Sequence, residues 1–191
     1  MVATPLHYPV AYILNRAGRG RLSLTGLVVG SFLPDIEVPV LLLIGFEYPH
    51  DRLVLHSIVG CLLFSWIIAA IALPFYGLFV EKLLNVKFEE KLTLNFLVSA
   101  EIGALFHVFV DLFHHAYNPL LWPFSSESVD TLVLFGNWRL ASIVMHVIFG
   151  TLLLVIVLIE LRNIKRLEEK SGVDLLRKLL IRLLVERVDV K

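Results

Sequence analysis

Four long apolar stretches constrain this chain of 191 residues more than any other feature. They run roughly over residues 22–46, 53–80, 92–114 and 140–161, and each reaches the ~20 residues that a helix needs to cross a bilayer. Hydrophobic residues make up 58% of the sequence, more than a soluble domain contains. The pattern predicts an all-α membrane protein with about four transmembrane helices.

A shorter half-helix is expected before these spans, over about residues 5–17, where it ends in the turn-like sequence AGRGR. Pro34 and Pro39 are expected to break or kink the first span, because proline lacks the N–H of the helical ladder.

A different kind of helix is expected near the C-terminus. Apolar residues recur there at helical spacing: Val173, Leu176, Leu179, Leu180 and Leu183. This spacing predicts an amphipathic helix that lies on the membrane or on a partner. Residues 1–161 would then form a membrane-embedded domain, and residues 162–191 a cytoplasmic tail.

Lysine and arginine gather on one side of the predicted spans. The turn before the first span, the loop between the second and third, and the segment after the fourth are basic, whereas the opposite loops hold only Arg52 and Arg139. The positive-inside rule therefore predicts a multi-pass protein of the cell membrane with a cytoplasmic C-terminus. The formal net charge is zero, so no nucleic-acid partner is expected.

Titratable residues converge at one depth of this bundle. Counting from the basic ends at 1.5 Å per helical residue places Asp35 about 21 Å, and His107 and His146 about 24 Å, from the cytoplasmic side. Asp111 follows His107 by four residues and shares its helix face. Polar side chains from distant parts of the sequence thus meet in the outer half of the membrane.

Two further histidines join this layer. His56 falls near the outer surface, and His7 reaches the depth of Asp35 if the half-helix folds back against the first span. Neutral imidazole and carboxylate are ligands of Zn²⁺, and ionisable residues within spans are functional by default. The sequence therefore predicts a site for one or two divalent metal ions, most plausibly Zn²⁺, formed by His7, Asp35, His56, His107 and Asp111.

Other polar residues have two interpretations. His50, His114 and His115 are either ligands or core histidines bonded to a backbone carbonyl. Glu37 and Glu101 either orient the metal ligands or face a wet cavity.

Four motifs resemble a family of membrane-bound, metal-dependent hydrolases of bacteria and archaea. In order over residues 6–124 they are His7, LPDIE for L-P-D-[IF]-D, DRLVLHS for H-R-G-x-T-H-S, and HVFVD followed by PLLWP. Asp51, Leu53 and Leu55 depart from the third motif, and the resemblance implies that Asp51 supports the ligands. His50 lies one position from the motif's first histidine and is a possible substitute.

The order of the histidines and aspartates is also distantly similar to that of the zinc-dependent phospholipase C and P1 nuclease superfamily, all-helical phosphoesterases with up to three zinc ions. The residues that would hold a first metal on this similarity are Asp35, His56, His107 and Asp111. His7 and Asp111 would help to hold a second. A third site would use His114 or His115 with His146, but Gly150 falls where its carboxylate is expected.

These observations predict an integral membrane hydrolase, a phosphoesterase that acts on a lipid or lipid-linked substrate through metal-activated water. Asp35 is the candidate general base. One alternative is a transporter or ion-binding protein that uses the same cluster, and another is a scaffold whose metal only joins the helices. Only the first span is interrupted and no internal repeat is visible, which favours the hydrolase over a transporter.

Overall fold

The computed structural model describes residues 4–47, 50–167 and 172–185, and this part of the chain is all-helical. The elements are η1 (Thr4–His7), α1 (Tyr8–Ala17), α2 (Leu24–Leu43), α3 (Ile58–Leu84), α4 (Leu94–Asp111), η2 (Leu134–Gly136), α5 (Trp138–Leu167) and α6 (Gly172–Leu184). Four of them, α2 to α5, are long and apolar enough to cross a membrane. The predicted fold class is therefore confirmed.

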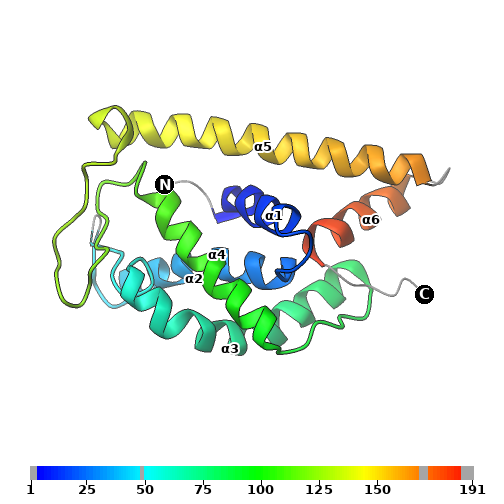
Figure 1. The fold of residues 1–191 in the computed structure, drawn as a ribbon, viewed down its shortest axis with the longest axis horizontal. Helices are drawn as coiled ribbons and strands as arrows, with labels where there is room; N and C mark the ends of the chain where they lie inside the picture. Colours follow the sequence, from blue (N-terminus) through cyan, green and yellow to red (C-terminus); the bar gives the residue numbers. More distant parts are fainter. Residues whose placement is uncertain (1–3, 48–49, 168–171, 186–191) are drawn as a thin grey trace.

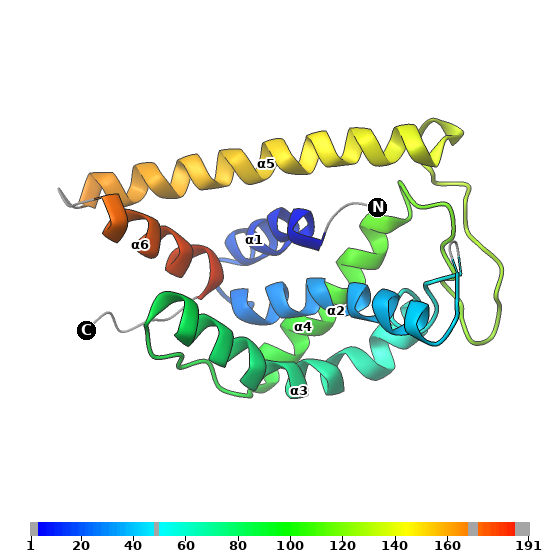
Figure 2. The same cartoon turned by 180° about the vertical axis from the view of Figure 1, so that it is seen from behind.

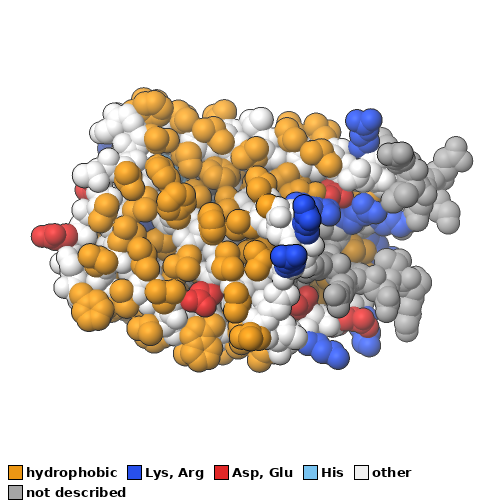
Figure 3. Space-filling view, viewed as in Figure 1, with side chains coloured by type: hydrophobic (Ala, Val, Ile, Leu, Met, Phe, Trp, Pro, Cys, Tyr) orange, Lys and Arg blue, Asp and Glu red, His pale blue; other side chains and the backbone are white. Residues whose placement is uncertain are grey.

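The helices form a bundle with α2 at its centre. Figure 1 shows α2, α3 and α4 packed together, with α5 along the opposite side and the short α1 between them, and Figure 2 shows the same order from behind. In the spanning window of α2, 61% of the residues are buried, against 28% in α3 and 22% in α5. Hydrophobic side chains cover the left and middle of the face drawn in Figure 3, as expected for a surface in contact with lipid, whereas Lys and Arg gather toward its right-hand end.

Two glycines set the close approach of α2 and α4. A Cβ on Gly30 would lie 1.9 Å from the Ala100 carbonyl oxygen, and one on Gly103 would lie 2.4 Å from the Leu27 carbonyl oxygen. The two backbones are therefore in direct contact, as small residues allow between helices in membranes. This contact brings Asp35 on α2 into the same layer as the polar end of α4.

The first span is not broken at its prolines. One helix, α2, continues through both Pro34 and Pro39. Pro34 cannot donate to the carbonyl four residues before it, but neighbouring helices can satisfy backbone groups near such a site. In this turn the Ser31 carbonyl accepts a hydrogen bond from Nδ1 of His107 on α4, at 2.7 Å.

The C-terminal helix α6 packs against its own bundle. Its buried residues Leu179 and Leu183 belong to the same apolar cluster as residues of α1, α2 and α5. Arg177 donates to the carbonyl oxygens of Leu84 and Asn85 at the end of α3, at 2.7 and 2.8 Å. Leu176 on the predicted apolar stripe is exposed, and the side chain of Val173 lies outside the described residues.

Candidate metal centre

Histidine and aspartate side chains from five segments meet at one end of the bundle. His7 ends η1, Asp35 lies on α2, and His56 precedes the capping residue of α3. The remaining side chains come from the end of α4 and the turn that follows it. Three overlapping groups have ligand atoms within 4.8 Å of one another: His7, Asp35 and His107; His56, His107 and Asp111; Asp111, His114 and His115.

Asp111 lies between two of these groups and faces one with each carboxylate oxygen. Its Oδ2 is 3.3 Å from Nε2 of His107 and 3.8 Å from Nε2 of His56. Its Oδ1 is 3.2 Å from Nε2 of His115 and 3.6 Å from Nε2 of His114. This is the geometry of a carboxylate that can bridge two cations.

Hydrogen bonds at Nδ1 fix the orientation of three of the histidines. The pairs are His56 with Glu37 (3.0 Å), His107 with the Ser31 carbonyl (2.7 Å) and His114 with the Val110 carbonyl (3.0 Å). Because these oxygens accept, each Nδ1 carries a proton, and in the neutral ring the lone pair is then on Nε2. Metal-binding histidines are held by the same kind of contact.

The lone pairs point into the cluster, where they face other lone pairs. Nε2 of His56, His107 and His114 and Oδ1 of Asp111 are buried without a hydrogen-bond partner in the described part of the chain. Burial lowers the pKa of His114 to about 3. Burial and the neighbouring His107 lower the pKa of His7 to about 3 as well, so both imidazoles are neutral at pH 7. Acceptor atoms that face one another are the ligand arrangement of a cation site.

The charge balance of the cluster also favours a cation. Four carboxylates are buried or nearly so: Asp35, Glu37, Asp51 and Asp111. Arg52 is the one guanidinium among them, 2.7 Å from Asp111 Oδ2 and 3.9 Å from Asp51 Oδ1. These five side chains alone sum to −4 + 1 = −3, and buried charge of one sign is costly unless it is paired. The donor set and the charge both fit one or two divalent ions.

Glu37 supports the loop that carries His56. Its carboxylate accepts from the backbone N–H groups of Leu53, Val54 and Leu55, at 3.1, 2.6 and 3.1 Å, as well as from His56. Residues 53–55 lie outside any helix, so these bonds define the approach to α3. These contacts connect Glu37 to His56, and its role in orienting a metal ligand stays a prediction.

Asp35 is the most accessible carboxylate of the cluster. Its side chain is 14% exposed, compared with 4% for Asp111. Its Oδ1 lies 3.5 Å from Nε2 of His107 and 3.9 Å from Nε2 of His56. It is therefore within reach of both the cluster and a molecule that enters from outside.

Several predicted residues lie apart from the three groups. His146 is half-buried on α5, where its Nδ1 donates to the Ser142 carbonyl at 2.7 Å. His50 is exposed, with its ring edge-on against Tyr117. Glu101 is half-buried on α4, and the described contacts do not connect it to the cluster.

Arg52 is the site residue that sequence reasoning did not identify. It was counted only as a charge of an external loop, yet its side chain is 3% exposed and bound to Asp111. The available signal was its place in the motif DRLVLHS, where the arginine of the family pattern is kept. Asp51, predicted to support the ligands, is buried beside it.

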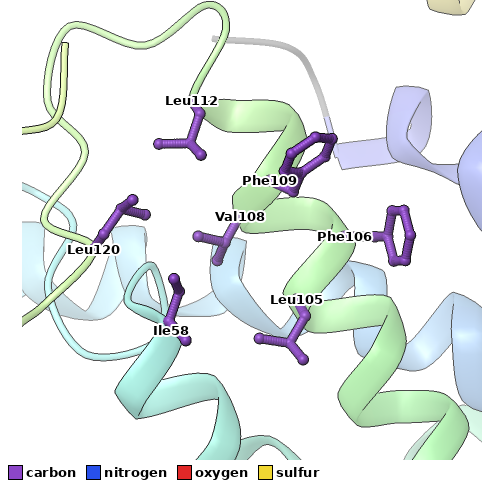
Figure 4. Close-up of a pocket in the computed structure, with 7 residues that line it drawn as sticks. All are labelled: Ile58, Leu105, Phe106, Val108, Phe109, Leu112 and Leu120. Atoms are coloured by element: carbon purple, nitrogen blue, oxygen red, sulfur yellow. The ribbon is translucent and has the colours of Figure 1, made fainter. Parts of the chain in front are cut away.

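An apolar cavity of about 330 Å³ lies on the other face of α4 (Figure 4). Helical spacing places its residues Leu105, Val108 and Leu112 on the face away from His107. Ile58 at the start of α3 closes one side, and its N–H donates to the Leu120 carbonyl at 3.0 Å. The cavity and the cluster thus share the last turns of α4 and the segment that leads into α3.

A family model described as YdjM inner membrane protein matches residues 6–184. The chain belongs to this family. The match includes every residue of the cluster and ends with the last residue of α6, and it agrees with the four apolar spans in identifying a membrane protein. No curated protein and no solved structure matches the chain. The similarity to the phospholipase C and P1 nuclease superfamily, with the hydrolase activity that it implies, stays a prediction.

Proposed function

We propose that this YdjM-family protein is a metal-dependent membrane hydrolase that cleaves a phosphoester in a lipid or lipid-linked substrate. The observation that carries the proposal is the set of buried lone-pair atoms that face one another around Asp111. Imidazole and carboxylate ligands of this kind suit Zn²⁺ and similar divalent ions.

Two metal positions follow from the geometry around Asp111. His56 and His107 would hold an ion on the Oδ2 side, with Asp35 as a further ligand. His114 and His115 would hold an ion on the Oδ1 side. His7, whose Nε2 is 3.6 Å from Oδ1, would complete the second position.

The chain's own residues then have distinct tasks in hydrolysis. A divalent ion at such a site supplies activated water and neutralises charge on the leaving oxygen. Asp35 would accept the proton of the attacking water through the carboxylate oxygen that is not bound to metal, because it is the most exposed carboxylate of the cluster. Arg52 would keep Asp111 oriented through its bond to Oδ2.

The apolar cavity beside α4 supports a lipid substrate. It opens among side chains that face the membrane, such as Phe106 and Phe109, next to the turns that carry His107 and Asp111. An acyl or prenyl chain in this position would lie along the last turns of α4, whose opposite face carries the cluster. We also propose that the cluster lies toward the outer side of the membrane and the C-terminus toward the cytoplasm, as the basic residues indicate.

A transporter or ion-binding protein could use the same cluster to relay protons or carry an ion. Such a path would have to continue toward the basic end of the bundle. There α2 and α4 meet through the buried apolar residues Leu27, Phe96 and Ala100. This packing favours the hydrolase.

The test is metal content and hydrolysis by the purified full chain. We expect one to two equivalents of zinc, and release of phosphate from lipid-linked phosphates that stops with chelation and returns with added zinc. His56→Ala should lose metal and activity, whereas His50→Ala, an exposed histidine of the same loop, should keep both. A metal-free protein without affinity for zinc would refute the proposal, and proton or ion flux without hydrolysis would favour the transporter.

A further inference from the structure

A polar cavity of about 460 Å³ lies at the opposite end of α1 from His7. It forms where the end of α1, the start of α2 and the last turn of α6 meet. Three arginines line it, Arg16, Arg19 and Arg182, together with Asn15 and Leu24. Lys and Arg side chains also gather at the α6 end of the molecule in Figure 3.

A buried carboxylate holds two of these arginines in place. Glu160 on α5 is fully buried and accepts from Arg16 at 2.7 Å and from Arg182 at 3.3 Å, with Tyr12 as a further donor. The Arg16 guanidinium also lies over the Tyr12 ring, 5.0 Å from its centroid. Contacts among α1, α5 and α6 thus hold the two guanidinium groups in place without a ligand.

The arginines keep donors for a ligand. A guanidinium has five N–H groups, and Glu160 engages one nitrogen of each. The side chains of Arg16 and Arg182 are 60% and 39% exposed, whereas Glu160 is too deeply buried to contact a molecule in the cavity. Planar guanidinium groups match the geometry of phosphate oxygens.

The positive charge is local. Three arginines against Glu160 leave 3 − 1 = +2 around this cavity. A neighbouring cavity of about 510 Å³ beyond Gly20 is lined by Glu89, Glu90 and Lys91, which sum to −1. An anion would therefore bind in the arginine-lined cavity rather than in the adjacent one.

We propose that this cavity binds the phosphate-bearing headgroup of an anionic phospholipid in the cytoplasmic leaflet. Leu24 lines the cavity and is also the first residue of the span α2, so the cavity lies where hydrocarbon meets the headgroups. Leu24 and the buried Val185 give it an apolar side along which the lipid's glycerol and chains can leave. Basic pockets between helices on the cytoplasmic side bind such headgroups in other membrane proteins.

The test is lipid binding to the purified full chain in detergent, titrated by native mass spectrometry. We expect phosphatidylglycerol to bind more tightly than phosphatidylcholine. Arg19→Gln should lower the affinity for phosphatidylglycerol by about fivefold. Arg19 has no contact with Glu160 and a positive φ of 53°, a strain that glutamine shares, so the fold should be unaffected. The matched control is Arg162→Gln, an exposed arginine of the same end outside the cavity, which should change binding less than twofold.

A second variant tests the geometry of the guanidinium. Arg182→Lys keeps a cation beside Glu160 but loses the planar guanidinium group. It should therefore lower the affinity for phosphatidylglycerol while the melting temperature stays unchanged. Equal binding of the two lipids, or equal effects of Arg19→Gln and Arg162→Gln, would overturn the proposal. If inorganic phosphate binds in an Arg19-dependent way and phosphatidylglycerol does not, the cavity is a site for free phosphate and the lipid assignment is wrong.

Discussion

Asp111→Asn tests whether one carboxylate serves two metal positions. In the structure Oδ2 faces His107 and Oδ1 faces His115, at 3.3 and 3.2 Å. Asparagine has a single carbonyl oxygen, and Arg52, which donates to Oδ2 at 2.7 Å, favours the rotamer that keeps this oxygen on its own side. The amide NH₂ then lies on the Oδ1 side, where it donates to an imidazole nitrogen and cannot bind a cation.

We therefore expect bound zinc to fall by at least one equivalent from the wild-type content. Any ion that remains on the Oδ2 side loses one unit of negative charge from its surroundings. Changes to residues that only support metal ligands cost 10- to 100-fold in affinity, so this change should cost at least that much, about 1.4–2.8 kcal/mol. The assay is elemental analysis of the purified protein with a zinc titration against a competing chelator.

The matched control is Asp130→Asn, which makes the same chemical change on an exposed aspartate of the loop after α4. It should leave the metal content as it is in the wild type. If Asp111→Asn folds and still binds as much zinc as the wild type with unchanged affinity, Asp111 does not bridge two ions and the assignment of the cluster is wrong.

Three further predictions concern topology, packing and the second metal position. Cysteine introduced at Lys87 should react only with reagent that enters the cytoplasm, and cysteine at Glu127 should react from outside; the reverse result would contradict the orientation. Gly30→Ala should lower the free energy of unfolding by about 1–3 kcal/mol or more in thermal melts, because its Cβ meets backbone at 1.9 Å, whereas Gly150→Ala, with no atom within 4 Å, should be neutral or slightly stabilising. His114→Ala should remove one equivalent of zinc and leave the other; retention of both would exclude His114 as a ligand.

Hydropathy predicted the fold class because each span carries its own signal in its length and composition. The expected spans 53–80 and 92–114 correspond to α3 and α4, with ends that differ by a few residues. The predicted break at Pro34 was wrong, because α2 continues through both prolines. Packing against other helices can hold a helix together at a proline, and a single segment of sequence does not show that packing. The contacts of α6 with α3 were likewise outside what its own amphipathic pattern could specify.

The cluster was partly predictable because depth in a membrane is nearly a one-dimensional property. Counting residues from basic anchors brought Asp35, His107 and His7 to one layer, and the structure places them within ligand distance. Counting also put His146 at that depth, but depth does not tell which way a side chain faces, and His146 lies outside the groups. Arg52 was missed because a charged residue in a loop is exposed by default, and only the fold shows that this loop turns inward.

The two acidic residues of the short sequence DIE, Asp35 and Glu37, have different roles. Four N–H donors surround the Glu37 carboxylate, so its role is architectural and it has little capacity left for proton transfer. The side chain of Asp35, two residues earlier, is 14% exposed, compared with 7% for Glu37. A glutamate at the second position has one more methylene than the aspartate of the related motif, which lets it reach across to another segment. Two acids that lie two residues apart on one helix can thus have different roles, one holding a loop and the other taking part in the reaction. Exchanging Asp35 and Glu37 would remove the contacts that hold residues 53–55.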